Sequence, residues 1–320
     1  MGGKQRWVSE LNVPTPELAI PKAELLEEAV ALEDALERAA FSFGPSPFLG
    51  VSAPGLLMWR DRYVYAYARR GDAAFLLSIQ NGEVYAPRPP APFTKESFAS
   101  LFDYLAAVNG PGPGKSRVEG LTEEEARTAE GWGYAPRLVA TDFIYERETI
   151  GALHGDAFRD RRNEINQLVK HHAVLLRPFR LSDLGDCGRL YEMWRDARSK
   201  HLEPIGAKML EQAQKAHLRC LTHFEDWGLG AWVLLVDGQL AAYTVAGNLS
   251  GNTLGIWLEV TDLTVKGAGA YIFAQTCRLH PGTYWVNTGD AEFLPGLREA
   301  KEHWHPAKKL KQFAIDPKGQ

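Results

Sequence analysis

Apolar and polar residues along the chain form two successive cycles of helical and strand patterns. In the first cycle, helical spacing with glutamates on the opposite face predicts a helix of about five turns over residues 21–41. The Asn81-Gly82 pair predicts a hairpin, and Thr94 is a predicted helix cap. The short runs typical of β-strands lie at residues 56–59, 63–68, 74–79, 83–86 and 138–145.

The second cycle starts at Phe158 and repeats this order. Residues 158–172 have helical spacing, residues 173–178 have a strand pattern, and further helices are predicted over 182–199 and 207–227. A meander is predicted next, with a tight turn at Asp237-Gly238 and strands at 231–236, 240–247 and 254–260. A glycine-rich turn, an apolar helix, a strand and a last helix complete the cycle. The pattern therefore predicts one α+β unit used twice.

The glycine-rich turn of the second cycle, at Gly267 and Gly269, has two interpretations. A strand ends at this point and a helix begins. Unpaired amides at a helix N-terminus, with no Cβ in the way, can bind a phosphate or a carboxylate. A tight turn without any ligand has the same pattern, so both interpretations stay open.

Composition narrows the class of protein. The chain has 320 residues, of which 45% are hydrophobic and 24% charged, as in a soluble globular protein of two domains. A net charge of -4 argues against a surface coated with basic residues, but it leaves room for a local basic groove. The sequence has no secretory pattern and no apolar run of the ~20 residues that a spanning helix needs. We therefore expect a cytoplasmic protein, with peripheral binding at the inner face of the membrane as a second option.

The cysteines and histidines predict no metal site. Three cysteines, far apart in apolar or helical patterns, are typical of reduced packing residues. The pairs His171-His172 and His303-x-His305 lack the carboxylate spacing of a hydrolytic zinc or iron site. We expect no metal and no permanently bound cofactor.

Two resemblances then become visible. The order of meander, glycine turn, helix and strand resembles the GNAT acyltransferase fold, although Thr264 stands where that superfamily has a basic or amide residue. From Phe143 onward the chain more closely resembles the C-terminal synthase domain of phosphatidylglycerol lysyltransferases. The residues that carry this resemblance are FIYERETIGALHGDAFRDRRNEINQLVK, WVLLVDGQLAAYTVAGNLSGNTLGIWLEVTDLTVKGAGAYIF and WVNTGDAEFLPGLREAKEHWHPAKKLKQFAI.

This resemblance implies an α+β fold with two tandem GNAT-like domains, built on mixed, mostly antiparallel sheets flanked by helices. The implied domains are an extension over 1–20, an N-terminal domain over 21–150 and a C-terminal domain over 151–320 with the active site. The implied reaction moves an aminoacyl group from charged tRNA to a lipid headgroup or to a small amine or hydroxyl acceptor. Acyl-CoA-dependent N-acyltransfer and a non-catalytic ligand-binding module are the alternatives.

Candidate site residues follow from this chemistry. Glu259, near the end of a strand, is expected to act as general base or to bind the donor's amine, or else to be an exposed strand residue with a charged neighbour. Tyr271 could protonate a leaving group or belong to the core. Asn287 and Asp290 follow the next strand and could bind an amine, and Asp290 could instead cap the next helix.

Two further sets concern the donor, which is expected to be aminoacyl-tRNA or acyl-CoA. The set expected to bind it at the glycine turn comprises Thr264, Lys266, Gly267, Ala268 and Gly269. A basic set is expected to contact phosphate groups, with ordinary solvated charge as the alternative interpretation. Its members are Arg159, Arg161, Arg162, Lys170, Arg298 and Lys301.

Overall fold

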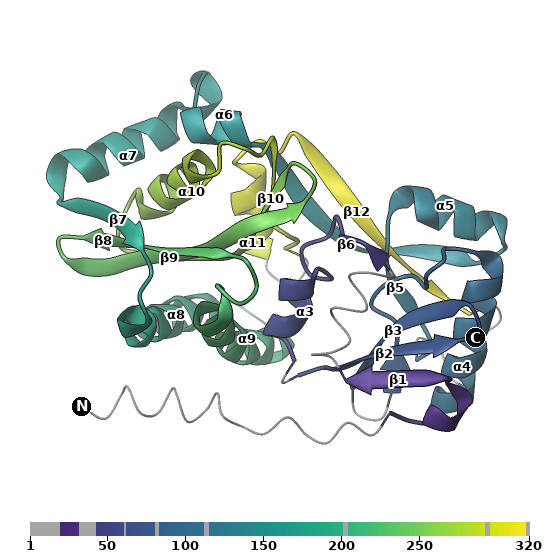
Figure 1. Cartoon of the computed structure of the whole chain (residues 1–320). Helices are drawn as coiled ribbons and strands as arrows, with labels where there is room; N and C mark the ends of the chain where they lie inside the picture. The colour runs from purple at the N-terminus through teal and green to yellow at the C-terminus, as the bar shows by residue number, and fades with distance from the viewer. Residues whose placement is uncertain are drawn as a thin grey trace. The chain divides into compact units, whose positions relative to one another are not determined.

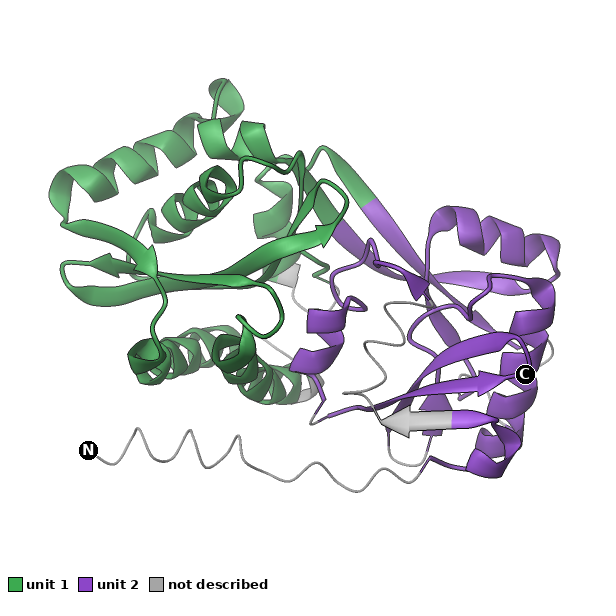
Figure 2. Cartoon of the chain, viewed as in Figure 1, with its two compact units in different colours: residues 1–13, 143–309 green, residues 14–142, 310–320 purple. Residues whose placement is uncertain are grey.

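The computed structural model (Figure 1) describes residues 20–31, 43–60, 62–80, 83–111, 115–200, 204–291 and 295–317. These residues form two compact units (Figure 2). Unit 1 comprises residues 143–309, and unit 2 comprises the described residues before 143 and those from 310 onward. The chain changes unit within β6 (Ala135–Glu146) and within β12 (Lys308–Asp316). The domain division predicted at residues 150 and 151 stays a prediction, and the predicted extension lies almost wholly outside the described residues.

Unit 2 contains an antiparallel sheet in the order β1-β2-β3-β4. Its apolar residues pack on α4 (Lys95–Asn109), where Phe98, Leu101 and Leu105 are fully buried. Thr94 caps this helix by accepting a hydrogen bond from the Ser97 amide at 3.2 Å, as predicted. The strands are β1 (Glu28–Ala31), β2 (Val64–Arg70), β3 (Ala73–Gln80) and β4 (Glu83–Tyr85); α3 (Ala53–Met58), β5 (Val118–Leu121) and α5 (Glu123–Gly131) complete the unit.

Two predictions for unit 2 are wrong. The predicted helix over 21–41 is instead a short 3-10 turn at Ala23–Leu25 followed by strand β1; residues 32–42 lie outside the described part. Strand β1 pairs its backbone with β2 and forms the edge of the sheet, and this tertiary pairing overrides the helical spacing. The strand predicted over 56–59 is helix α3, because Ser52 caps it and Pro54 occupies its first turn.

The Asn81-Gly82 pair, predicted to form a hairpin turn, lies outside the described residues. The strands on either side of it, β3 and β4, pair in antiparallel register, with Gln80 opposite Glu83.

Unit 1 holds the strands in the order β6-β11-β10-β9-β8-β7. On one face of this sheet lie α6 (Arg147–Ala152), α7 (Arg159–His171) and α10 (Ala268–Leu279); on the other lie α8 (Leu184–Ser199) and α9 (Pro204–His223) (Figure 1). The strands are β7 (Val174–Pro178), β8 (Gly230–Val236), β9 (Gln239–Ser250), β10 (Thr253–Thr261) and β11 (Trp285–Asn287), and α11 (Pro295–Glu302) follows. The predicted meander and helices of the second cycle are confirmed, as is the α+β class with mixed, mostly antiparallel sheets flanked by helices.

Strands β10 and β11 pair in parallel over only three positions, from Thr253 opposite Trp285 to Gly255 opposite Asn287. Strand β10 continues beyond this point, bulges between Ile256 and Leu258, and stays paired only with β9. Its last residues, among them the exposed Glu259, therefore extend beyond the part of β10 that pairs with β11.

Candidate functional site

Glu259 lies near the end of β10, beyond the residues that pair with β11, and is paired with Thr244 of β9. Its side chain is exposed to solvent, yet the surrounding protein displaces enough water to raise the pKa of the carboxyl group to about 8, while Lys301 opposes this rise. Because the group keeps contact with water, solvent screens part of the effect. The result is an accessible carboxyl group with a pKa above its ordinary value, which suits proton transfer near neutral pH.

Two groups from neighbouring elements interact with Glu259. Burial raises the pKa of the Tyr145 hydroxyl on β6, and the charge of Glu259 adds to the rise. Burial likewise raises the pKa of the Cys277 thiol on α10, again with a contribution from Glu259. Both groups are therefore neutral at physiological pH. Tyr145 is absent from the predicted set, although it lies in the FIYE run that carries the family resemblance.

The loop after β11 borders the same region. Asn287 is fully buried, and its side-chain oxygen accepts a hydrogen bond from the Gly289 amide at 2.7 Å. Asp290, three residues after Asn287, is exposed. The Nζ of Lys301, half-buried on α11, donates to the carbonyl oxygens of residues 288, 289 and 290 at 2.7, 2.9 and 2.7 Å. These hydrogen bonds tie the Lys301 side chain to the backbone of the loop. The phosphate contact predicted for Lys301 stays a prediction.

The glycine turn has a packing explanation. The backbone of Gly267 has the left-handed conformation, with φ of 89°, and this residue precedes the first residue of α10. A Cβ at this position would lie 2.6 Å from the Glu164 carbonyl oxygen and 3.3 Å from the Leu168 side chain, both on α7. Glycine is therefore required here for the close approach of the turn to α7, whether or not a ligand binds. At Gly269, by contrast, a Cβ would make only an ordinary contact of 3.7 Å with Thr261.

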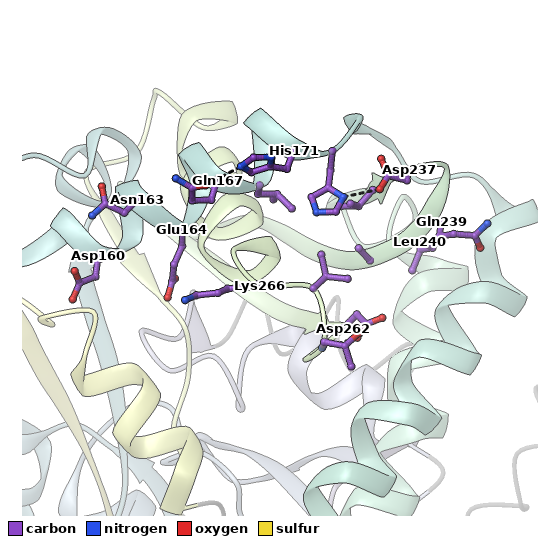
Figure 3. Close-up of a pocket in the computed structure, with 16 residues that line it drawn as sticks. Asp160, Asn163, Glu164, Gln167, His171, Asp237, Gln239, Leu240, Asp262 and Lys266 are labelled. Atoms are coloured by element: carbon purple, nitrogen blue, oxygen red, sulfur yellow. Dashed lines mark hydrogen bonds and ion pairs between the residues drawn. The ribbon is translucent and has the colours of Figure 1, made fainter.

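A hollow of about 880 Å³ lies beside this turn (Figure 3). Helix α7, the β8–β9 hairpin turn and the β10–α10 loop all contribute to it, and Thr264 and Lys266 are among its lining residues. The Thr264 hydroxyl donates to Asp262 at 2.6 Å. Four carboxylates line the hollow, against one lysine and two histidines, so its charge favours a cationic group over a polyphosphate. These carboxylates are Asp160, Glu164, Asp237 and Asp262.

The lining of the hollow divides the predicted site residues. It includes Thr264 and Lys266 from the donor set but neither Glu259 nor Asn287 from the catalytic set. The hollow also contains residues that the sequence did not single out, such as Asp160 and Glu164 on α7, because only the packing of α7 beside the turn brings them there.

Tyr271, half-buried on α10, packs against the apolar cluster that contains Leu168 and Ile272. This contact matches the core alternative for that residue. His172 is hydrogen-bonded to Asp237 at 2.6 Å, and His171 to Gln167 at 3.0 Å. Within the described ranges, no group of three or more His, Cys, Asp or Glu side chains could hold a metal ion.

The α7 members of the predicted basic set separate into hydrogen-bonded and exposed residues. Arg162 donates to the carbonyl oxygens of Leu153 and Gly155, and Arg161 pairs with Glu164 at 3.1 Å. Arg159 and Lys170 are exposed near opposite ends of α7, and Arg298 is exposed on α11. Among the α7 members, Arg159 and Lys170 are therefore the better placed to meet a large anionic partner.

Solved structures resemble this fold at low sequence identity. A conserved protein of unknown function from Bacteroides thetaiotaomicron is 21% identical with a TM-score of 0.76, covering 89% of this chain and 97% of that one. L-PGS from Bacillus licheniformis is 15% identical with a TM-score of 0.61, covering 90% and 92%. The C-terminal domain of a putative lysylphosphatidylglycerol synthetase from Agrobacterium fabrum is 16% identical with a TM-score of 0.58, covering 89% and 93%.

Sequence comparison adds one curated relative and a family. An uncharacterised protein of Mycoplasmoides gallisepticum is 25% identical over 143 residues, and the match spans 44% of each chain. Among the described residues, no helix has the length and apolar character needed to cross a membrane. Residues 52–315 match the family described as phosphatidylglycerol lysyltransferase, C-terminal. That match extends over most of the chain, which therefore belongs to the phosphatidylglycerol lysyltransferase C-terminal family.

Proposed function

We propose that the protein is an aminoacyltransferase that moves an aminoacyl group from charged tRNA to a lipid headgroup or to a small amine or hydroxyl acceptor. The observation that carries this proposal is the accessible Glu259 carboxyl group of raised pKa at the diverging end of β10, in a chain of the lysyltransferase family. A base with a pKa near the working pH can both accept and return a proton during acyl transfer.

The proposed reaction proceeds by direct transfer. The acceptor's hydroxyl or amine attacks the carbonyl carbon of the aminoacyl ester, and its proton passes to the Glu259 carboxylate. Collapse of the tetrahedral intermediate breaks the bond between this carbon and the ribose oxygen. The proton then passes from Glu259 to that oxygen, so the carboxylate is regenerated. Asp290, exposed in the loop after β11, would orient the reacting amine, and the buried Asn287 would hold this loop through the Gly289 amide.

Acyl-CoA is the less favoured donor. Its pyrophosphate would have to bind at the start of α10, beside a hollow lined by four carboxylates. Like charges in a partly enclosed space repel, and Lys266, together with the Arg161 that pairs with Glu164, offsets only part of the negative charge. The protonated α-amine of an aminoacyl ester would instead be attracted to these carboxylates.

A transfer assay tests the proposal directly. Total tRNA charged with labelled amino acids is incubated with the protein and either phosphatidylglycerol vesicles or small amines, and acetyl-CoA is tested in parallel. We expect label to move from tRNA to an acceptor, and acetyl-CoA neither to acylate these acceptors nor to raise the melting temperature. Label transfer from acetyl-CoA alone, or from neither donor, would contradict the proposal.

Charge removal on α7 should weaken tRNA binding. We expect Arg159→Ala and Lys170→Ala each to raise the Kd for tRNA and to lower the slope of log K against log salt by about one, because each removes one phosphate contact. Fluorescence anisotropy across a salt series measures this slope. The matched control is Lys215→Ala, an exposed lysine on α9 at the other face of the sheet. A slope unchanged in both α7 variants would show that this helix does not bind the tRNA.

A further inference from the structure

We propose that Lys301 is a positioning residue of the transfer site: its ammonium group fastens the loop after β11 and directs positive charge toward Glu259. This inference deepens the proposed function and rests on it for the role of Glu259. Lys301 comes from α11 and is hydrogen-bonded to the loop after β11, and its charge acts on Glu259 near the end of β10.

The hydrogen bonds of Lys301 are those of a built-in clamp. A lysine ammonium group has three N–H donors, and the three consecutive carbonyl oxygens of Thr288, Gly289 and Asp290 accept from it within 2.9 Å. The ring of Phe143 lies 5.6 Å from the same Nζ and adds a favourable contact with the cation. A lysine whose ammonium group was hydrated at the surface would not make these contacts with the protein.

The backbone of Lys301 is fixed as well. The buried Tyr145 hydroxyl donates to the Lys301 carbonyl oxygen at 2.9 Å. Tyr145 and Phe143 both lie on β6, which pairs with β11 through Val286 opposite Tyr145. The same strand thus holds both the lysine and the strand that leads into the clamped loop.

The loop depends on the clamp for its shape. Gly289 has φ of 71°, and its carbonyl oxygen accepts from the Phe143 amide at 3.2 Å while it also accepts from Lys301. Three carbonyl dipoles that converge on one point repel one another unless a cation sits between them. Removing the ammonium group should therefore release the loop between Asn287 and Asp290, of which Asp290 is proposed to orient the amine.

The charge of Lys301 acts on Glu259. The titratable groups that interact with Glu259 are Tyr145 from β6, Cys277 from α10 and Lys301 from α11. The first two are neutral at physiological pH because burial raises the pKa of each. Within the described part of the chain, Lys301 is therefore the cation that stabilises the carboxylate form of Glu259.

Titration of Glu259 tests the inference without any activity measurement. In protein with ¹³C-labelled glutamate, where Glu259→Gln identifies the resonance, we expect Lys301→Met to raise the pKa of Glu259 by about one unit. We also expect amide exchange at Thr288 and Gly289 to quicken about tenfold. Lys301→Arg, which keeps the charge, should leave the Glu259 titration close to that of the native protein. Lys215→Met, at an exposed α9 position, is the matched control and should change neither quantity.

A second measurement needs no variant, in case Lys301→Met does not fold. In ¹⁵N-lysine spectra of the native protein, the clamped Lys301 ammonium group should exchange its hydrogens with water more slowly than that of Lys215. An unshifted Glu259 titration in folded Lys301→Met, or a Lys301 ammonium group that exchanges as fast as Lys215, would overturn the inference. Neither result depends on transfer activity, so the proposed function is judged separately.

Discussion

Glu259→Gln should lower kcat/KM for aminoacyl transfer by about 10²–10⁴-fold. Glutamine has nearly the same size and keeps a hydrogen-bonding group, but it cannot accept the acceptor's proton. The loss should fall on kcat more than on KM, because the carboxylate accepts a proton in the transition state and does not bind the donor in the ground state. The matched control is Glu225→Gln, the same change at an exposed residue after α9, and it should leave transfer unchanged.

The pH profile carries the same prediction in a second form. A general base must be ionised, so the transfer rate should rise with pH through the pKa of Glu259. This pKa is raised from the ordinary value of about 4.3 to about 8. This limb should vanish in Glu259→Gln. A variant that keeps more than about a tenth of the native rate, with the same pH limb, would remove Glu259 from the mechanism.

The raised pKa of Glu259 also makes the stability of the folded protein depend on pH. A carboxyl group whose folded pKa exceeds its unfolded pKa favours the folded state most at low pH, and this contribution is lost as pH rises through the folded value. The native protein should therefore lose stability relative to Glu259→Gln between about pH 4 and pH 8, the unfolded and folded pKa values of the group. Thermal unfolding of both proteins across this range measures the difference without any substrate.

Much of unit 1 could be predicted from local pattern. Helix α7 has helical spacing, and Asp237-Gly238 is a two-residue turn with both φ angles positive, at 51° and 80°, as a tight hairpin requires. Glu259 could be nominated because it ends a strand before a glycine turn. In unit 2 the helical spacing of residues 21–41 misled, because strand β1 forms by pairing with β2 rather than by its own propensity.

The rest of the site depends on contacts between distant residues. Tyr145 and Lys301 are 156 residues apart and meet only because β6 lies beside β11 in the sheet. Likewise, the reason for glycine at position 267 is the carbonyl group of Glu164, more than a hundred residues earlier. No spacing rule links such positions. The sequence therefore nominated Gly267 and Lys301 for anion binding, whereas their observed contacts are with the protein's own backbone.

Gly267→Ala should destabilise the folded protein by about 2–5 kcal/mol. A non-glycine residue in the left-handed region costs about 1–2 kcal/mol, and forcing a Cβ against the backbone of α7 adds about 1–3 kcal/mol. A backbone carbonyl cannot rotate away as a flexible side chain can, so the turn or α7 must shift. Denaturant unfolding of the native and variant proteins measures the loss.

Gly269→Ala is the matched change two residues along, inside α10, where the new Cβ has room beside Thr261. It should be neutral or should stabilise by about 0.5–1 kcal/mol, because alanine favours the helix over glycine. Together the two variants distinguish a glycine that is required for packing against α7 from a glycine that is required for the approach of a ligand. If Gly267 serves helix packing, the large loss appears in the protein without substrate and only at position 267. If both glycines admit a donor, the two variants instead keep native stability and lose donor binding together, and that outcome would overturn the packing explanation.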